Sequence, residues 1–394
     1  MNPELALLQP YPFEKIRALL DGITPADKSF IALSVGEPKH AAPQFVLDAL
    51  VDKLRGVENY PSTRGSEELR GSIASWLTNR FSLNNADKLA ASQILPVNGT
   101  REALFAIAQC LLDRTQKSRD VLMPNPFYQI YEGATLLAGC KPVFYSISAA
   151  GDDDINAITD EQFESCQLFY LCNPGNPTGS VLSKPALTRL IEKAQQFNFY
   201  LVSDECYSEI YRESAGAPVG LLEAAHAMGN TDYKQCVVFH SLSKRSNLPG
   251  LRSGFIAGDE QVIKQFLLYR TYHGCSMSPP VQHASAIAWQ DEKHVEANRK
   301  AYDEKYDAVL PLLKPVMQIE KPDAGFYLWP TLPVEDTTFT QAMMRDHNLA
   351  VVPGSYLGRE INGSNPGSRH VRLALVAQLD ECIDAANRLV SALS

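Results

Sequence analysis

Short apolar runs alternate with amphipathic stretches through the middle of the chain. Residues 101–112 place Leu104, Ile107, Ala108 and Leu111 at helical spacing, and residues 187–197 also show a helical pattern. The runs that we expect to be strands are 94–97, 121–123, 168–172, 200–203, 237–239 and 255–257. Short buried strands separated by helices predict an α/β fold with a mostly parallel, doubly wound sheet.

The pattern changes towards the C-terminus. A long charged helical pattern covers 294–313, a β-type run covers 325–329, and a final helical pattern covers 381–393. This part predicts a smaller α+β domain. We therefore expect an N-terminal arm with part of the small domain at 1–45, a large domain at 46–285, and the C-terminal small domain at 286–394.

Composition and charge narrow the class of protein. The 394 residues are 45% hydrophobic and 21% charged, as in globular proteins, and the formal net charge of −9 argues against nucleic acid or an anionic membrane as the main partner. The eight cysteines form no C-x-x-C, and several lie in apolar runs, so we expect reduced core residues. Neither a signal peptide nor a membrane-spanning run is visible, which predicts a cytoplasmic protein. We expect no metal site.

The densest group of candidate functional residues surrounds Lys244. Ser241 and Ser243 precede it, a Pro-Gly turn follows, and Arg252 comes eight positions later. Hydroxyls and a guanidinium beside an amine form an anion pocket next to a nucleophile. Pyridoxal phosphate needs this combination, because its aldehyde bonds an amine and its phosphate needs a cradle. Taken alone, the motif could also be a surface lysine in a polar loop.

Four further motifs follow predicted strands, whose carboxyl ends meet at one edge of such a sheet. Asn98-Gly99-Thr100-Arg101 is either a phosphate-binding helix start or an ordinary helix cap. Tyr128 either lies on a heteroaromatic ring or packs in the core. The Pro- and Gly-rich turn 173–179 would fix the amide of Asn176. Asp204 is either a cap or a carboxylate that keeps a pyridine nitrogen protonated.

The order of these motifs resembles that of the class I aminotransferases of fold type I, which depend on pyridoxal phosphate. The resemblance runs from Val35-Gly36-Glu37-Pro38, through Tyr60-Pro61-Ser62-Thr63-Arg64-Gly65, to His370-Val371-Arg372-Leu373. It implies that the chain moves an amino group between an amino acid and a 2-oxo acid. It also implies a homodimer with shared active sites.

The resemblance implies roles for individual residues. Lys244 would hold the cofactor covalently and move the substrate proton, and Asp204 would pair with the pyridine nitrogen. Tyr207 and Asn176 would hydrogen-bond the ring oxygen, and Tyr128 would stack on the ring. Residues around the phosphate would be Gly99, Thr100, Arg101, Ser241, Ser243 and Arg252, with Tyr60 reaching in from the second subunit. The substrate α-carboxylate would bind Arg372 and the backbone of Gly36.

The last part of the chain resembles the N-succinyldiaminopimelate aminotransferases of bacterial lysine biosynthesis, in residues 352–360, 365–367 and 372–376. Aspartate aminotransferases of the family carry an arginine shortly before a Pro-Pro turn, whereas this chain has His273 before Pro279-Pro280. We therefore expect N-succinyl-LL-2,6-diaminopimelate as the amino donor and 2-oxoglutarate as the acceptor. The alternatives are an aspartate, methionine or kynurenine aminotransferase, a pyridoxal phosphate-dependent C–S lyase, or a non-catalytic regulator that keeps the pocket.

Overall fold

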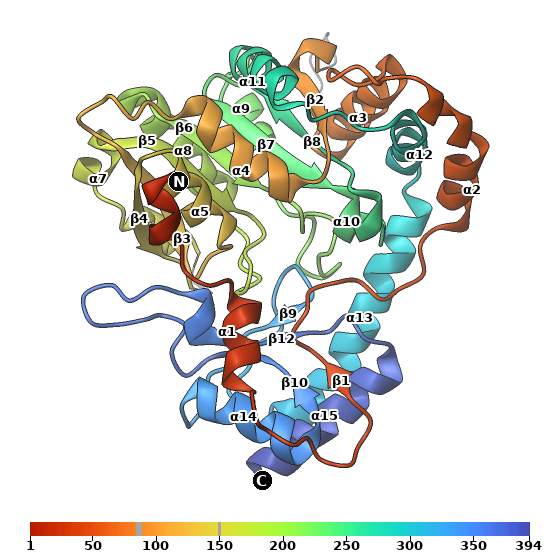
Figure 1. Ribbon diagram of the computed structural model, residues 1–394, viewed down its shortest axis with the longest axis vertical. Helices are drawn as coiled ribbons and strands as arrows, with labels where there is room; N and C mark the ends of the chain where they lie inside the picture. Colours follow the sequence, from red (N-terminus) through yellow and green to blue (C-terminus); the bar gives the residue numbers. More distant parts are fainter. Residues whose placement is uncertain (84–88, 149–150) are drawn as a thin grey trace.

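A seven-stranded sheet forms the upper part of the molecule (Figure 1). The computed structural model describes residues 1–83, 89–148 and 151–394. The strand order is β2-β8-β7-β6-β5-β3-β4, and β8 alone in this sheet runs antiparallel to its neighbours. The strands are β2 (Ile94–Val97), β3 (Asp120–Asn125), β4 (Lys141–Ser146), β5 (Cys166–Cys172), β6 (Tyr200–Asp204), β7 (Cys236–Ser241) and β8 (Gly254–Gly258). This confirms the predicted α/β fold with a mostly parallel sheet.

Helices cover both faces of the sheet, so the strands are buried on both sides. One hydrophobic cluster joins the sheet to α4 (Thr100–Leu111), α5 (Ile130–Leu137) and α11 (Glu260–His273). The opposite cluster contains α3 (Glu67–Arg80), α8 (Lys184–Phe197), α9 (Leu221–Ala227) and α12 (Pro279–Gln290). Along β5, Leu168 and Tyr170 enter the first cluster while Phe169 and Leu171 enter the second, because successive strand side chains point to opposite faces.

The structure extends one predicted strand past a proline. We expected the strand at 121–123 to stop before Pro124, but β3 continues to Asn125. The register with β5 ends at Leu122, and beyond that point β3 pairs only with β4. A proline is tolerated there because its missing N–H removes no bond from a second neighbouring strand.

A third hydrophobic cluster lies in the lower part of Figure 1 and combines both ends of the chain. There β1 (Ile31–Ala32) pairs in parallel with β10 (Leu349–Ala350). A separate antiparallel sheet has the order β11-β12-β9, formed by Val352–Pro353, Val371–Ala374 and Tyr327–Leu328. The helices of this part are α13 (Lys293–Leu313), α14 (Asp336–His347) and α15 (Leu379–Leu393). The long helix α13 runs from the upper part to the lower part (Figure 1).

Short elements complete the described structure. An N-terminal helix, α1 (Pro12–Leu19), lies at the boundary between the upper and lower parts (Figure 1). The remaining helices are α2 (Gln44–Asp52), α6 (Asp152–Asn156), α7 (Asp160–Glu164) and α10 (Leu242–Arg245). The 3-10 helices are η1 (Pro3–Leu7), η2 (Leu54–Glu58), η3 (Ala91–Gln93), η4 (Pro249–Leu251) and η5 (Gly354–Leu357).

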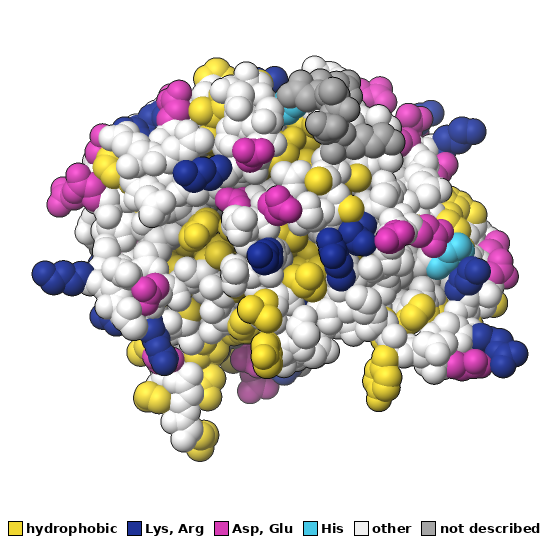
Figure 2. Space-filling model, turned by 90° about the horizontal axis from the view of Figure 1, so that it is seen from above, with side chains coloured by type: hydrophobic (Ala, Val, Ile, Leu, Met, Phe, Trp, Pro, Cys, Tyr) yellow, Lys and Arg dark blue, Asp and Glu magenta, His cyan; other side chains and the backbone are white. Residues whose placement is uncertain are grey.

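The surface agrees with the mixed composition. Seen from above, acidic and basic side chains are interspersed, and hydrophobic side chains protrude along one edge (Figure 2). Among residues 1–83, 89–148 and 151–394, no helix is both long and apolar enough to span a membrane. All eight cysteines are free, as the sequence predicted.

Candidate active site

A cavity of about 500 Å³ lies at the carboxyl ends of the sheet strands, between the sheet and the lower part of the molecule. Its size is typical of small-molecule sites. All but two of the predicted site residues line it. These residues are Gly36, Thr100, Arg101, Tyr128, Asn176, Asp204, Tyr207, Ser241, Ser243, Lys244, Arg252 and Arg372.

The two predicted residues outside the lining are Gly99 and Tyr60. Gly99 precedes α4 with a φ of 86°, and a side chain there would overlap the guanidinium of Arg252. Only glycine therefore permits Arg252 to lie against the start of α4. Tyr60 is fully exposed, at 104% of its reference area, and does not reach the cavity of its own chain.

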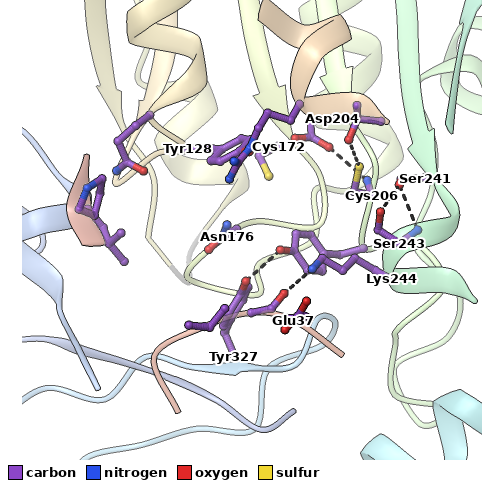
Figure 3. Close-up of a pocket in the computed structure, with 18 of the residues that line it drawn as sticks. Glu37, Tyr128, Cys172, Asn176, Asp204, Cys206, Ser241, Ser243, Lys244 and Tyr327 are labelled. Atoms are coloured by element: carbon purple, nitrogen blue, oxygen red, sulfur yellow. Dashed lines mark hydrogen bonds between the residues drawn. The ribbon is translucent and has the colours of Figure 1, made fainter. Parts of the chain in front are cut away.

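Lys244 enters the cavity from the short helix α10, with its amine directed towards the segment that carries Glu37 (Figure 3). The side chain of Ser241 caps this helix by accepting a hydrogen bond of 3.1 Å from the N–H of Ser243. The amine donates to the carbonyl of Gly36, which brings the N-terminal segment against the lysine. Burial lowers the pKa of Lys244 to about 8, and the nearby charge of Arg372 acts in the same direction.

Asp204 ends β6 and is only 5% exposed. Its Oδ2 accepts a hydrogen bond of 2.9 Å from the hydroxyl of Tyr131, and its Oδ1 accepts one of 3.3 Å from the N–H of Cys206. Burial raises the pKa of Asp204, while the hydrogen bonds from Cys206 and Tyr131 act in the opposite direction. The carboxylate forms no ion pair within the described ranges of the chain, so a cationic ring nitrogen bound in the cavity would supply a partner.

Hydroxyls and Arg252 gather on the side of the cavity next to α10. The hydroxyl of Ser241 lies 3.0 Å from that of Ser243 and 3.2 Å from the carbonyl of Ser253. Arg252 adopts a left-handed conformation with a φ of 53°, and its Nη1 donates to the carbonyl of Pro249 at 2.8 Å. Hydroxyls and a guanidinium that converge in this way suit a phosphate group.

Arg101 and Tyr128 form a separate polar group beside the N-terminal arm. The Nε of Arg101 donates to the hydroxyl of Tyr128 at 2.6 Å, and its Nη2 donates to the hydroxyl of Tyr11 at 3.1 Å. The guanidinium also lies near both tyrosine rings, 5.6 and 5.8 Å from their centroids. The motif at the start of α4 predicted that Arg101 would lie in the site, but it did not predict the two phenols that accept its hydrogen bonds.

Arg372 faces the cavity from β12. Its Nη2 donates to the carbonyl of Ser34 at 2.9 Å, and its Nη1 donates to the side-chain oxygen of Asn176 at 3.2 Å. The Nε of Arg372 is buried without a hydrogen-bond partner. A bound carboxylate would satisfy that donor and remove the cost of leaving it unpaired.

Tyr207 is tied to the lower part of the molecule. Its hydroxyl lies 3.0 Å from that of Tyr327, which also lines the cavity (Figure 3). A side chain at Gly36 would overlap the Tyr327 hydroxyl, so Gly36 lets the backbone approach closely. By contrast, His273 is exposed at the end of α11, bonds Cys275 at 2.9 Å, and lies outside this cavity.

Several residues of the site were missed by the sequence analysis. Tyr11, Glu37, Cys206 and Tyr327 line the cavity, and Tyr131 supports Asp204 from behind. Tyr131 carried no spacing signal, because Tyr128 lies before α5 and its contact with Asp204 depends on how that helix packs. Tyr11 carried none either, because its place in the site depends on how the N-terminal arm crosses the cavity.

The charges of the cavity fit pyridoxal phosphate. The lining includes the four cationic side chains of Arg101, Lys244, Arg252 and Arg372, but only two carboxylates, Glu37 and Asp204. This excess suits a ligand that carries a phosphate together with a substrate that carries a carboxylate. Such ligands would supply a cationic partner for the buried Asp204 and an acceptor for the buried Nε of Arg372.

Comparison with known proteins identifies the family. The family model "Aminotransferase class I and II" matches residues 28–388. A crystal structure of an aminotransferase from Neisseria meningitidis is 43% identical, with a TM-score of 0.94 and full coverage of both chains. A probable aminotransferase of Mycobacterium tuberculosis is 32% identical over 91% of this chain and 80% of its own length.

A further relative is named for its substrate. The LL-diaminopimelate aminotransferase of Maridesulfovibrio salexigens is 26% identical over 98% of this chain and 97% of its own length. The family match covers most of the chain, and the site contains the lysine, carboxylate and arginines that the motifs predicted. The chain therefore belongs to the class I and II aminotransferases, which are enzymes that depend on pyridoxal phosphate.

Proposed function

We propose that this aminotransferase moves the amino group of N-succinyl-LL-2,6-diaminopimelate to 2-oxoglutarate in the biosynthesis of diaminopimelate and lysine. The observation that carries the proposal is the excess of cationic side chains around one cavity of about 500 Å³. Arg101 and Arg252 would meet the cofactor phosphate and Arg372 the α-carboxylate, so this excess supports transamination of an amino acid. The absence of an arginine from residues 271–279 and the relative named for LL-diaminopimelate support the choice of amino donor.

The residues of the chain divide the work of catalysis. Pyridoxal phosphate supplies a ring that withdraws electrons from the substrate α-carbon. Lys244 would hold the cofactor and then, with its lowered pKa, accept the proton from the α-carbon. Arg372 would orient the substrate by its α-carboxylate, and Asp204 would hold the ring nitrogen in its protonated form.

The remaining contacts would fix the cofactor in place. Tyr207 and Asn176 would donate to the ring oxygen, and Tyr128 would cover one ring face. The phosphate would lie among Gly99, Thr100, Arg101, Ser241, Ser243 and Arg252, with Tyr60 added by a second subunit.

We also propose the domain division 1–45, 46–285 and 286–394, with the active site between the large and small domains. The pairing of β1 with β10 supports it, because this contact joins residues 31–32 to residues 349–350. The hydrophobic cluster of the lower part, which draws on both ends of the chain, supports the same division.

A homodimer with shared active sites is the third part of the proposal. Exposed apolar side chains precede Tyr60 on α2 and η2, namely Val51 at 68%, Leu54 at 57% and Val57 at 62% exposure. An exposed apolar surface of this kind suits association with a second copy. The free cysteines support a reducing, cytoplasmic location.

Substrate choice gives the first prediction. The purified enzyme should form glutamate from 2-oxoglutarate when N-succinyl-LL-2,6-diaminopimelate is the amino donor. Its kcat/KM for this donor should be at least about tenfold above that for aspartate, which is a difference of about 1.4 kcal/mol in activation free energy. Arg372→Lys should raise KM strongly for every donor, because it loses the planar fork that grips a carboxylate. Equal kcat/KM values for the two donors would overturn the specificity. Product formed without any 2-oxo acid would indicate a lyase.

Site sharing gives the second prediction. In a hybrid of Tyr60→Phe and Lys244→Ala subunits, one site carries both defects and the other carries neither, provided that Tyr60 acts across the interface. Mixing the two inactive or weakened homodimers under subunit exchange should therefore restore part of the activity. Each homodimer treated alone serves as the control. If exchange is demonstrated by mass spectrometry and activity stays at the level of the parents, the shared site is wrong.

The proton chemistry of Lys244 gives the third prediction. In protein freed of cofactor, competitive acetylation should report a pKa of about 8 for Lys244 instead of the usual 10.5. Because the folded pKa is the lower one, the unfolded state binds more protons between these values, so stability relative to Lys244→Met should rise with pH across that window. Arg372→Gln should raise the pKa and Glu37→Gln should lower it further. A pKa near 10.5 would contradict the buried amine.

A further inference from the structure

Tyr131 is a buried residue that lies behind the site, against Asp204, Tyr128 and Cys172. It lies in the first turn of α5, and its side chain is 0% exposed. Its hydroxyl donates a hydrogen bond of 2.9 Å to Oδ2 of Asp204, but the residue does not line the cavity. It therefore cannot contact a substrate, and any effect on the reaction has to pass through these neighbours, of which Asp204 accepts its hydrogen bond.

The ring of Tyr131 is fixed on several sides. It stacks on Tyr170 with 4.6 Å between centroids and 14° between planes, and its centroid lies 5.8 Å from that of Tyr128, with 85° between those two planes. Its backbone carbonyl accepts a hydrogen bond of 2.8 Å from the hydroxyl of Thr135. A phenol held in this way keeps its O–H directed at one oxygen of Asp204, so little entropy is lost when the bond forms.

The surroundings of Asp204 make this donor important. Burial raises the pKa of Asp204 and so favours the neutral acid, which would be a poor partner for a protonated ring nitrogen. The titratable groups that act on it are Cys206 beside it in the chain, Tyr131 on α5 and His240 on β7, while Cys172 and Tyr128 are also close enough to interact with it electrostatically. Tyr131 donates a hydrogen bond to the carboxylate through its hydroxyl, and Cys206 donates one through its backbone N–H.

Cys206 also contacts a residue outside Asp204 through its sulfur. The sulfur of Cys206 lies 3.0 Å from the hydroxyl of Thr100, at the start of α4. Cys206 is thus connected to the predicted phosphate site as well as to Asp204 (Figure 3). Tyr131 donates from α5 to the other carboxylate oxygen, Oδ2, so the two donors hold both oxygens of Asp204.

We propose that Tyr131 is a positioning residue that keeps Asp204 ionised and oriented for the ring nitrogen of pyridoxal phosphate. The inference rests on the proposed roles of Asp204 and the cofactor. An O–H bond to an ionised carboxylate is a charge-assisted hydrogen bond, which stabilises the charged form over the neutral one. Loss of the hydroxyl should weaken only those interactions that depend on the charge of Asp204.

The test compares two cofactors that differ at the ring nitrogen. Protein freed of cofactor is titrated with pyridoxal phosphate and with 1-deazapyridoxal phosphate, in which a carbon replaces that nitrogen, and Kd is measured by fluorescence. Tyr131→Phe should weaken binding of pyridoxal phosphate by roughly tenfold, as expected for the loss of a hydrogen bond to a charged group. Binding of the deaza analogue should stay within about twofold of the wild type, because it has no nitrogen for Asp204 to hold.

Tyr170→Phe is the matched control. Tyr170 is equally buried and stacks on the ring of Tyr131, but its hydroxyl donates to the carbonyl of Leu104 at 2.7 Å. This variant loses a buried tyrosine hydroxyl without touching Asp204, so it should leave the ratio of the two Kd values unchanged. In an Asp204→Asn background, Tyr131→Phe should have no further effect on that ratio.

Other outcomes would overturn the inference. Equal weakening of both cofactors by Tyr131→Phe would show a general packing role, and no weakening of either would show that the hydroxyl is not needed. If Tyr131→Phe does not fold, Tyr131→3-fluorotyrosine replaces it: the stronger donor should tighten pyridoxal phosphate relative to the analogue, and an unchanged ratio contradicts the proposal. Wild-type protein that binds neither cofactor would overturn the proposed function itself.

Discussion

The burial of a carboxylate at the end of β6 is the constraint on which the site depends. Asp204 is held away from water at the edge of the sheet, where burial opposes its charge. Two hydrogen-bond donors stabilise the charged carboxylate, the hydroxyl of Tyr131 on α5 and the backbone N–H of Cys206. A doubly wound sheet makes this possible, because helices on both faces seal the strands while their carboxyl ends open into one cavity.

Contacts between the two parts of the molecule complete the cavity. Arg372 reaches Asn176 from the opposite side, and Tyr207 meets Tyr327. Outside the cavity, Nε and Nη2 of Arg359 donate to the two carboxylate oxygens of Glu132 on α5, at 2.8 and 2.5 Å. These contacts place groups from distant parts of the sequence around one ligand-sized space, and they tie the geometry of the site to the arrangement of the two parts.

Much of this could be predicted from the sequence. The strands are short apolar runs, and the motifs around Thr100, Asn176, Asp204 and Lys244 each follow a strand or open a helix, so the topology brings them together. Arg372 was predicted from the family resemblance alone. No local pattern could place it in the cavity, because its position depends on how the lower part packs against the sheet. The strand boundary at Pro124 was wrong because it depends on which neighbour pairs there.

Contacts between side chains were the part that could not be predicted. The bonds of Arg101 to Tyr11 and Tyr128 depend on the path of the N-terminal arm, and the bond of Tyr131 to Asp204 depends on the packing of α5 against the sheet. Neither has a spacing signature in the sequence, since the partners are 27 to 90 positions apart.

The central claim is that Lys244 is the residue that bonds the cofactor, and borohydride reduction tests it most directly. The chain also contains Lys305, which is buried, has a pKa lowered by burial to about 8, and donates to the carbonyls of Leu375 and Val376. Reduction of the purified, cofactor-loaded protein, followed by peptide mass spectrometry, should place a single phosphopyridoxyl group on Lys244. The same label on Lys305 or on any other lysine would contradict the account.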